Sequence, residues 1–174
     1  MKQVRISIVA TLVLIVALGS LSSRALGQIA LVDAGDFEVG ILLGEPTGLS
    51  AKLWASGNTA FDLGVAWSFG DGGHFHLHGD YLFHNFDFFD VNSGSLPVYV
   101  GIGGRLRFED DDDRNDLLDD DDDDYRVGLR IAIGLEYILE SNPFSFFFEV
   151  APIVDFLPDT EADVNGGIGV RYIF

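Results

Sequence analysis

Long segments in which apolar residues alternate with small or polar ones limit most strongly what this chain can fold into. Between residues 59 and 69, a large apolar side chain recurs at every second position from Phe61 to Trp67. Because successive side chains of a strand point to opposite faces, this period of two predicts a β-strand with one apolar face. Turn signals separate eight such segments, which are 37–44, 49–55, 59–69, 74–84, 97–108, 125–137, 144–155 and 164–174.

The length and number of these segments predict the architecture. Most of them have 9 to 13 residues. A tilted strand needs about 9–11 residues to cross a bilayer, whereas strands of soluble proteins usually have about 5 or 6. An even number of antiparallel strands can close into a barrel, which leaves no unpaired edge. We therefore expect an all-β fold, an eight-stranded antiparallel up-and-down transmembrane β-barrel.

The apolar face of such a barrel points inward in a soluble protein and toward lipid in a membrane protein. The opposite face here is rich in Gly and Ala, which fit the narrow interior of eight strands, and it carries charges of both signs. These observations favour lipid. Aromatic residues near the segment ends would form the interfacial girdles: Phe37, Phe61, Phe69, Phe75, Phe108, Tyr125, Tyr137, Phe144, Tyr172 and Phe174. The alternative is a soluble periplasmic barrel that binds an apolar ligand, as lipocalins do.

The first 27 residues have the three-part pattern of a secretory signal peptide. Lys2 and Arg5 give a basic start, residues 6–18 form an apolar run, and residues 25–27 (Ala-Leu-Gly) resemble a cleavage site. The run is shorter than the roughly 20 residues of a transmembrane helix, although an uncleaved anchor is an alternative. We expect residues 1–27 to be removed during export through the general secretory pathway.

Residues 28–174 are then the barrel domain, and we expect it in the bacterial outer membrane. The chain has no cysteine, so the exported domain has to be stabilised without disulfides. Its formal net charge is −18, which argues against nucleic acid as a partner because acidic surfaces repel phosphates. Motifs of hydrolases such as G-x-S-x-G and H-E-x-x-H are absent, and we expect no enzymatic activity.

Strand alternation places six basic and six acidic side chains inside the barrel. An isolated charge in a narrow interior is costly, so these groups have to be paired or solvated. We expect a network of salt bridges that plugs the barrel. The alternative is a narrow gated channel for ions or small solutes. The twelve residues are Glu38, Lys52, Asp62, Asp80, Arg105, Arg107, Arg126, Arg130, Glu136, Glu149, Asp155 and Arg171.

The four histidines all lie in segment 74–84, and His74, His76 and His78 share the inward face with Asp80. Imidazoles bind zinc or copper. Residues i and i+2 of a strand lie nearly 7 Å apart, so a shared metal would need bent side chains. Neutral histidines in the interior hydrogen-bond network are the simpler expectation, with a metal site as the weaker candidate.

Residues 109–124 contain eleven Asp, one Glu and one Arg. By chain order this segment is the third outer loop when both ends of the barrel are periplasmic, and its self-repulsion predicts disorder. The EF-hand pattern is absent, so we expect no cofactor beyond weak binding of Ca²⁺ or Mg²⁺. The candidate ligands are Asp110, Asp111, Asp112, Asp113, Asp119, Asp120, Asp121, Asp122, Asp123 and Asp124.

The last segment ends in Phe174, with the aromatic Tyr172 two residues earlier and alternating apolar positions before it. This ending resembles the C-terminal signature of bacterial outer-membrane barrels, which their assembly machinery reads. The domain resembles the small OmpA/OmpX-like barrels, and residues 44–52 and 149–155 resemble a family of uncharacterised outer-membrane barrels.

The resemblance implies the barrel fold, an outer-membrane location, and contacts with membrane lipid and the barrel-assembly machinery. The resemblance implies little about activity, and it does not identify a surface ligand. We expect a structural or interaction barrel with an acidic surface loop. Barrels of the OmpX type usually have several long outer loops. The predicted turns at 45–48 and 70–73 are short, which argues against adhesion by a surface of many loops.

Overall fold

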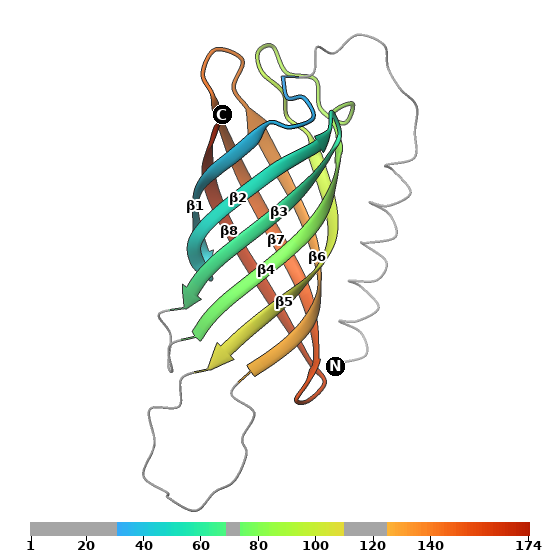
Figure 1. Ribbon diagram of the computed structural model, residues 1–174. Coiled ribbons are helices and arrows are strands. Elements are labelled where there is room, and N and C mark those ends of the chain that lie inside the picture. Colours follow the sequence, from blue (N-terminus) through green and yellow to red (C-terminus); the bar gives the residue numbers. More distant parts are fainter. Residues whose placement is uncertain (1–30, 69–73, 110–124) are drawn as a thin grey trace, which may run out of the picture.

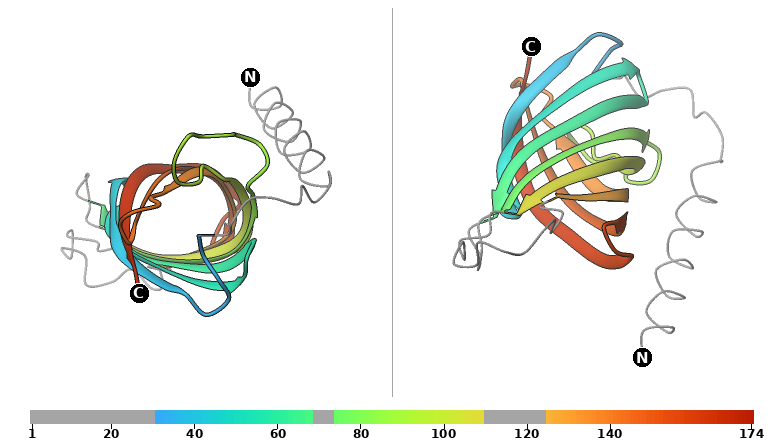
Figure 2. Two further views of the ribbon diagram at one scale, coloured as in Figure 1. Left: turned by 90° about the horizontal axis from the view of Figure 1, so that it is seen from above. Right: turned by 60° about the horizontal axis from the view of Figure 1, so that its bottom comes forward.

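The computed structural model describes residues 31–68, 74–109 and 125–174, and these residues form one closed barrel of antiparallel strands (Figure 1). Each strand pairs with its neighbours in the chain, and β8 closes the ring by pairing with β1 (Figure 2). The predicted eight-stranded up-and-down barrel is confirmed. The strands are β1 (Phe37–Glu45), β2 (Thr47–Ser56), β3 (Thr59–Ser68), β4 (His74–Asn85), β5 (Val98–Glu109), β6 (Tyr125–Ile138), β7 (Phe144–Leu157) and β8 (Glu161–Ile173).

Two turns are tighter than the sequence pattern predicts. The predicted turn at 45–48 shrinks because Thr47 already belongs to β2, and its hydroxyl donates to the Gly44 carbonyl at 2.9 Å. Gly48 pairs with Leu42 on β1 and Ala66 on β3. Likewise, β7 runs to Leu157 and β8 begins at Glu161, so that only residues 158–160 connect them. The predicted turn at 45–48 therefore includes a glycine, Gly48, that is paired within the sheet.

The polarity of the barrel is inverted relative to a soluble protein. In β3, residues 61–67 alternate between exposed apolar and buried small or polar side chains. Among the described residues, sixteen polar or charged residues are buried, against twelve hydrophobic ones. Large hydrophobic side chains stand on the outside of all eight strands, with Leu63 57% exposed and Ile168 58% exposed. The outer surface is therefore apolar and the interior is charged.

The two ends of the barrel differ. Figure 1 shows the C-terminus and residues 31–36 at the same end, which we call the terminal end. There, residues 31–36 fold back over the barrel: the Gly35 amide donates to the Trp54 carbonyl at 2.8 Å, and the Trp54 amide donates to the Asp36 carbonyl at 2.9 Å. An apolar cluster closes this end, formed by Val32, Trp54, Ala60 and Ile138 with Leu31, Phe86 and Ile173 packed against it.

No helix within the described ranges is long and apolar enough to cross a membrane. The predicted signal peptide at 1–27 and the predicted acidic loop at 110–124 lie outside the described residues. The same holds for residues 69–73 between β3 and β4 and for the side chains of Ser68, His74 and Glu109. The fold therefore positions only the barrel wall, its interior and the connections that have just been named.

Candidate functional site

The structure places ten of the twelve predicted interior charges inside the barrel, each at most 6% exposed. Arg107 and Arg126 differ, because their side chains are 23% and 27% exposed. Arg107 lies near the end of β5 and Arg126 near the start of β6, so both lie at the end of the barrel opposite the terminal end. Strand alternation alone finds the inward face, but it does not show how deep a residue lies.

Arg171 holds together the part of the interior nearest the terminal end. From β8 its guanidinium donates to Asp62 on β3 at 2.6 Å, to Ser50 on β2 at 2.8 Å and to Glu136 on β6 at 3.3 Å. The Lys52 ammonium also donates to Glu136, and both of these side chains are fully buried. These bonds join four strands across the interior, so they fix the shape of the barrel as well as neutralise charge.

A second group of charges lies at mid-height. Arg130 of β6 donates to Asp80 on β4 at 2.8 Å and also pairs with Glu149 on β7. The hydroxyl of Tyr99 on β5 donates to the same Glu149 at 2.8 Å. The group therefore links four consecutive strands. The neutral Tyr99 satisfies a carboxylate that a salt bridge alone would leave partly bonded.

Neutral donors that the sequence interpretation did not single out complete the interior. Glu38 accepts hydrogen bonds from the Trp54 indole at 2.6 Å and the Ser145 hydroxyl at 2.7 Å. His84 lies with its Nε2 3.6 Å from Glu136 and its ring 4.4 Å from that of Trp54. All of these positions follow the inward alternation of their strands. The alternation would have found them if it had been applied to aromatic and neutral polar residues.

Charged side chains of β5, β6, β7 and β8 gather at the opposite end of the barrel. Arg105 is bidentate to Asp155 and donates to Asp163 at 2.7 Å, while Arg126 pairs with Glu161. Two cavities, of about 190 and 160 Å³, lie at this end. Their shared lining residues are Arg105, Arg107 and Asp163. Within the described residues, the interior is therefore apolar at the terminal end and charged at the opposite end.

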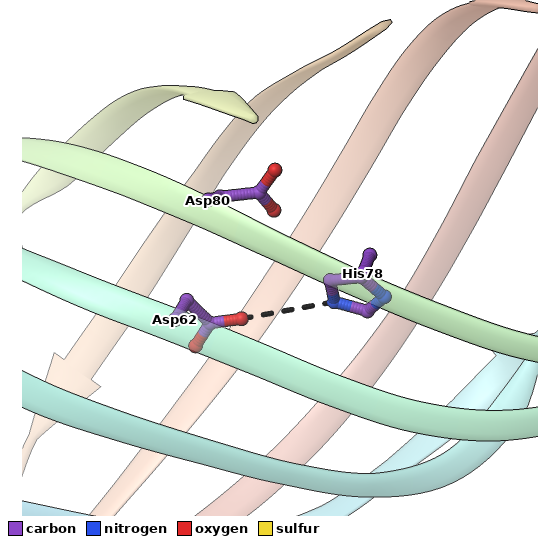
Figure 3. Close-up of side chains that lie close together, drawn as sticks. All are labelled: Asp62, His78 and Asp80. Carbon is purple, nitrogen blue, oxygen red and sulfur yellow. Dashed lines mark ion pairs between the residues drawn. The ribbon is translucent and has the colours of Figure 1, made fainter. Parts of the chain in front are cut away.

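The predicted histidine set is only partly brought together. His76, His78 and Asp80 are buried inside, whereas the side chain of His74 and the candidate loop aspartates lie outside the described residues. The residue that joins His78 and Asp80 is Asp62, which the metal hypothesis had not included (Figure 3). It was missed because it comes from the neighbouring strand β3, and a single-strand pattern cannot show cross-strand neighbours.

Gly134 on β6 provides a test of how tightly the interior is packed. A Cβ atom at this position would lie 2.3 Å from the Tyr99 ring and 2.5 Å from a backbone oxygen. We expect Gly134→Ala to displace the ring, break its bond to Glu149 and lower the free energy of unfolding by about 1–3 kcal/mol. Gly104→Ala is the matched control, since its Cβ would have its nearest neighbour at 3.5 Å. Urea titration of both variants measures the difference. Equal unfolding midpoints would contradict tight packing around Gly134.

Comparison with known proteins identifies the fold. The N-terminal β-barrel domain of Pseudomonas aeruginosa OprF superposes with a TM-score of 0.63 over 82% of this chain and 100% of that chain, at 15% sequence identity. The chain has the fold of that barrel. No family model matches the sequence, and no curated protein matches it. The predicted likeness to small OmpA-like barrels is therefore confirmed at the level of the fold.

Proposed function

We propose that this protein is a structural or interaction barrel of the bacterial outer membrane. The inverted polarity carries the proposal. Outward-facing side chains such as Leu63, Ile102 and Ile168 are 54–58% exposed and surround the barrel. A soluble monomer rarely exposes contiguous apolar patches larger than a few hundred Å², so a belt of this extent needs a nonaqueous neighbour. Membrane lipid suits this apolar belt, because the belt runs around the whole barrel and includes residues of every strand.

The positions of aromatic residues and the chain end support the same proposal. Phe37 and Phe144 begin their strands near the terminal end, and Phe75 and Phe108 stand together at the opposite end, with ring centroids 6.1 Å apart. Such rings suit the two interfaces of a bilayer. At the C-terminus, Tyr172 and Phe174 are exposed on the outer face, where the barrel-assembly machinery could bind them. Membrane lipid and this machinery are the proposed partners, and the proposed export route uses residues 1–27.

The interior supports a structural role over the alternative of a channel. Oppositely charged side chains bridge it at two levels, around Arg171 and around Arg130. The apolar cluster around Trp54 closes the terminal end. We expect the purified protein to give no large, steady conductance in planar bilayers, because ions would have to separate buried pairs. Stable openings in every active bilayer would contradict the plug and favour the channel.

Fractionation of cells that express the protein tests the location. We expect it in the outer-membrane fraction, extractable only with detergent, and with a gel mobility that changes on heating as the barrel unfolds. A soluble lipocalin-like binder would instead be released by osmotic shock without detergent. Recovery in that soluble fraction would overturn the proposal.

A further inference from the structure

Three buried side chains in the middle of the barrel form a cluster that the salt-bridge network does not fully use. They are Asp62 on β3 with His78 and Asp80 on β4 (Figure 3). Each offers one ligand atom, and the three atoms lie within 4.8 Å of one another. Each residue is at most 3% exposed. Two carboxylates and one imidazole from adjacent strands therefore lie close together.

The atoms of this cluster have bonding capacity left. The His78 Nε2 lies 3.8 Å from the Asp62 Oδ2, which is too long for a hydrogen bond. Neither His78 Nδ1 nor Asp80 Oδ1 has a hydrogen-bond partner within the part of the chain that the structure describes. Since buried polar atoms are nearly always bonded, the Asp80 Oδ1 is suited to a further partner, and so is the His78 Nε2 that faces Asp62.

The strand register explains how the cluster forms. Asp62 lies opposite Asp80, and Gly64 lies opposite His78. A Cβ atom on Gly64 would lie 2.1 Å from the His78 Cε1 and 2.5 Å from its Nε2. The imidazole therefore lies across Gly64, and this position brings its Nε2 toward Asp62 two residues away. The glycine is what allows a histidine and two aspartates to meet on adjacent strands.

The charge balance of the surrounding interior favours a cation. Arg105 and Asp155 pair with each other toward the opposite end. The remaining buried charges of the described residues are five carboxylates and three cations. Uncompensated charge in a buried site is costly, so two further positive charges would stabilise this network. The groups counted are Glu38, Asp62, Asp80, Glu136, Glu149, Lys52, Arg130 and Arg171.

We propose that Asp62, His78 and Asp80 bind one divalent transition-metal ion of the zinc class inside the barrel. One imidazole nitrogen and two carboxylate oxygens suit Zn²⁺, at about 2.0–2.2 Å each, with water in a fourth position. The nitrogen disfavours Ca²⁺ and Mg²⁺, which take oxygen ligands. The ligand atoms lie within 4.8 Å of one another, so they would have to approach by roughly 1 Å to share one ion at these bond lengths.

Two arginines would orient the ligands. Arg171 holds Asp62 by its Oδ1, and Arg130 holds Asp80 by its Oδ2. In each case one carboxylate oxygen is engaged and the other is left for the ion, which is the usual arrangement of outer-shell partners in metal sites.

Titration of the purified, full-length protein in detergent, after treatment with a chelator, tests the proposal. We expect calorimetry to show one equivalent of Zn²⁺, and Co²⁺ to give visible absorption bands of a low-coordinate site. His78→Gln and Asp80→Asn should each weaken Zn²⁺ binding at least tenfold. Gly64→Ala should weaken it as well, because it displaces the imidazole and changes no ligand. Heat-dependent gel migration shows that each variant is folded.

His76→Gln is the matched control, because His76 is equally buried on the same strand and lies outside the cluster. It should bind Zn²⁺ with the affinity of the unmodified protein. Failure of the folded protein to bind Zn²⁺ would overturn the proposal. Binding that is unchanged in His78→Gln would also overturn it, since the ion would then lie on other carboxylates.

Discussion

Replacing Arg171 with methionine should lower the free energy of unfolding by about 3–5 kcal/mol. Arg171 is buried and donates to Asp62, Glu136 and Ser50, and its guanidinium stacks 3.8 Å above the Phe147 ring. Methionine fills most of the volume but leaves Asp62 in a buried site with no cation bonded to it. Urea titration of the folded protein in lipid vesicles measures the loss.

Two further variants show whether this loss comes from the unpaired carboxylate. Adding Asp62→Asn to Arg171→Met should recover part of the stability, because it removes the buried negative charge. Arg126→Met should cost at most about 1 kcal/mol, since Arg126 and its partner Glu161 are partly exposed. Equal losses in Arg171→Met and Arg126→Met would contradict the account of a stabilising interior plug.

Replacing Leu63 with arginine should lower the free energy of unfolding in vesicles by about 2–4 kcal/mol. Leu63 is the fifth of ten residues in β3 and points outward. If the belt lies in lipid, this position is near the bilayer midplane, where a charged side chain is most costly. The folding equilibrium in urea, with vesicles of one defined lipid, measures the effect.

The depth of the substituted residue provides the control. Leu157→Arg introduces the same charge on the same outer face at the last residue of β7, where the side chain can reach the interface. Its cost should be about 0–1 kcal/mol. In a soluble barrel both positions would face water, so Leu63→Arg would then be neutral or would improve solubility. That outcome would favour the lipocalin-like alternative.

The sequence predicted the barrel because period-two alternation is a local property. Segments such as 125–137 carry it without interruption, and the structure extends that strand by a single residue to Ile138. The same alternation assigned Glu38, Glu136 and Arg171 to the interior. The predicted starts of the strands that begin at Thr47 and Glu161 were less accurate. Turn-forming residues such as Pro show that a turn is present, but they do not show how many residues it has.

The partners of the interior charges could not be predicted from the sequence. Arg171 and Asp62 are 109 residues apart, and Lys52 and Glu136 are 84 apart. These pairs depend on how the strands are staggered around the barrel, which alternation does not encode. The cluster of Asp62, His78 and Asp80 was missed for the same reason, since it requires the register of β3 against β4 and the space above Gly64.

Depth-dependent fluorescence quenching tests the central claim, that the apolar outer face lies in lipid. The chain has no cysteine, so Leu63→Cys, Ile102→Cys and Ile168→Cys each provide one site for an environment-sensitive dye on the belt. Gly57→Cys, in the turn between β2 and β3, is the water-exposed control. In vesicles with brominated acyl chains, we predict strong quenching at the three belt positions and little at residue 57. Equal quenching by aqueous iodide at all four positions, with no effect of brominated lipid, would contradict it.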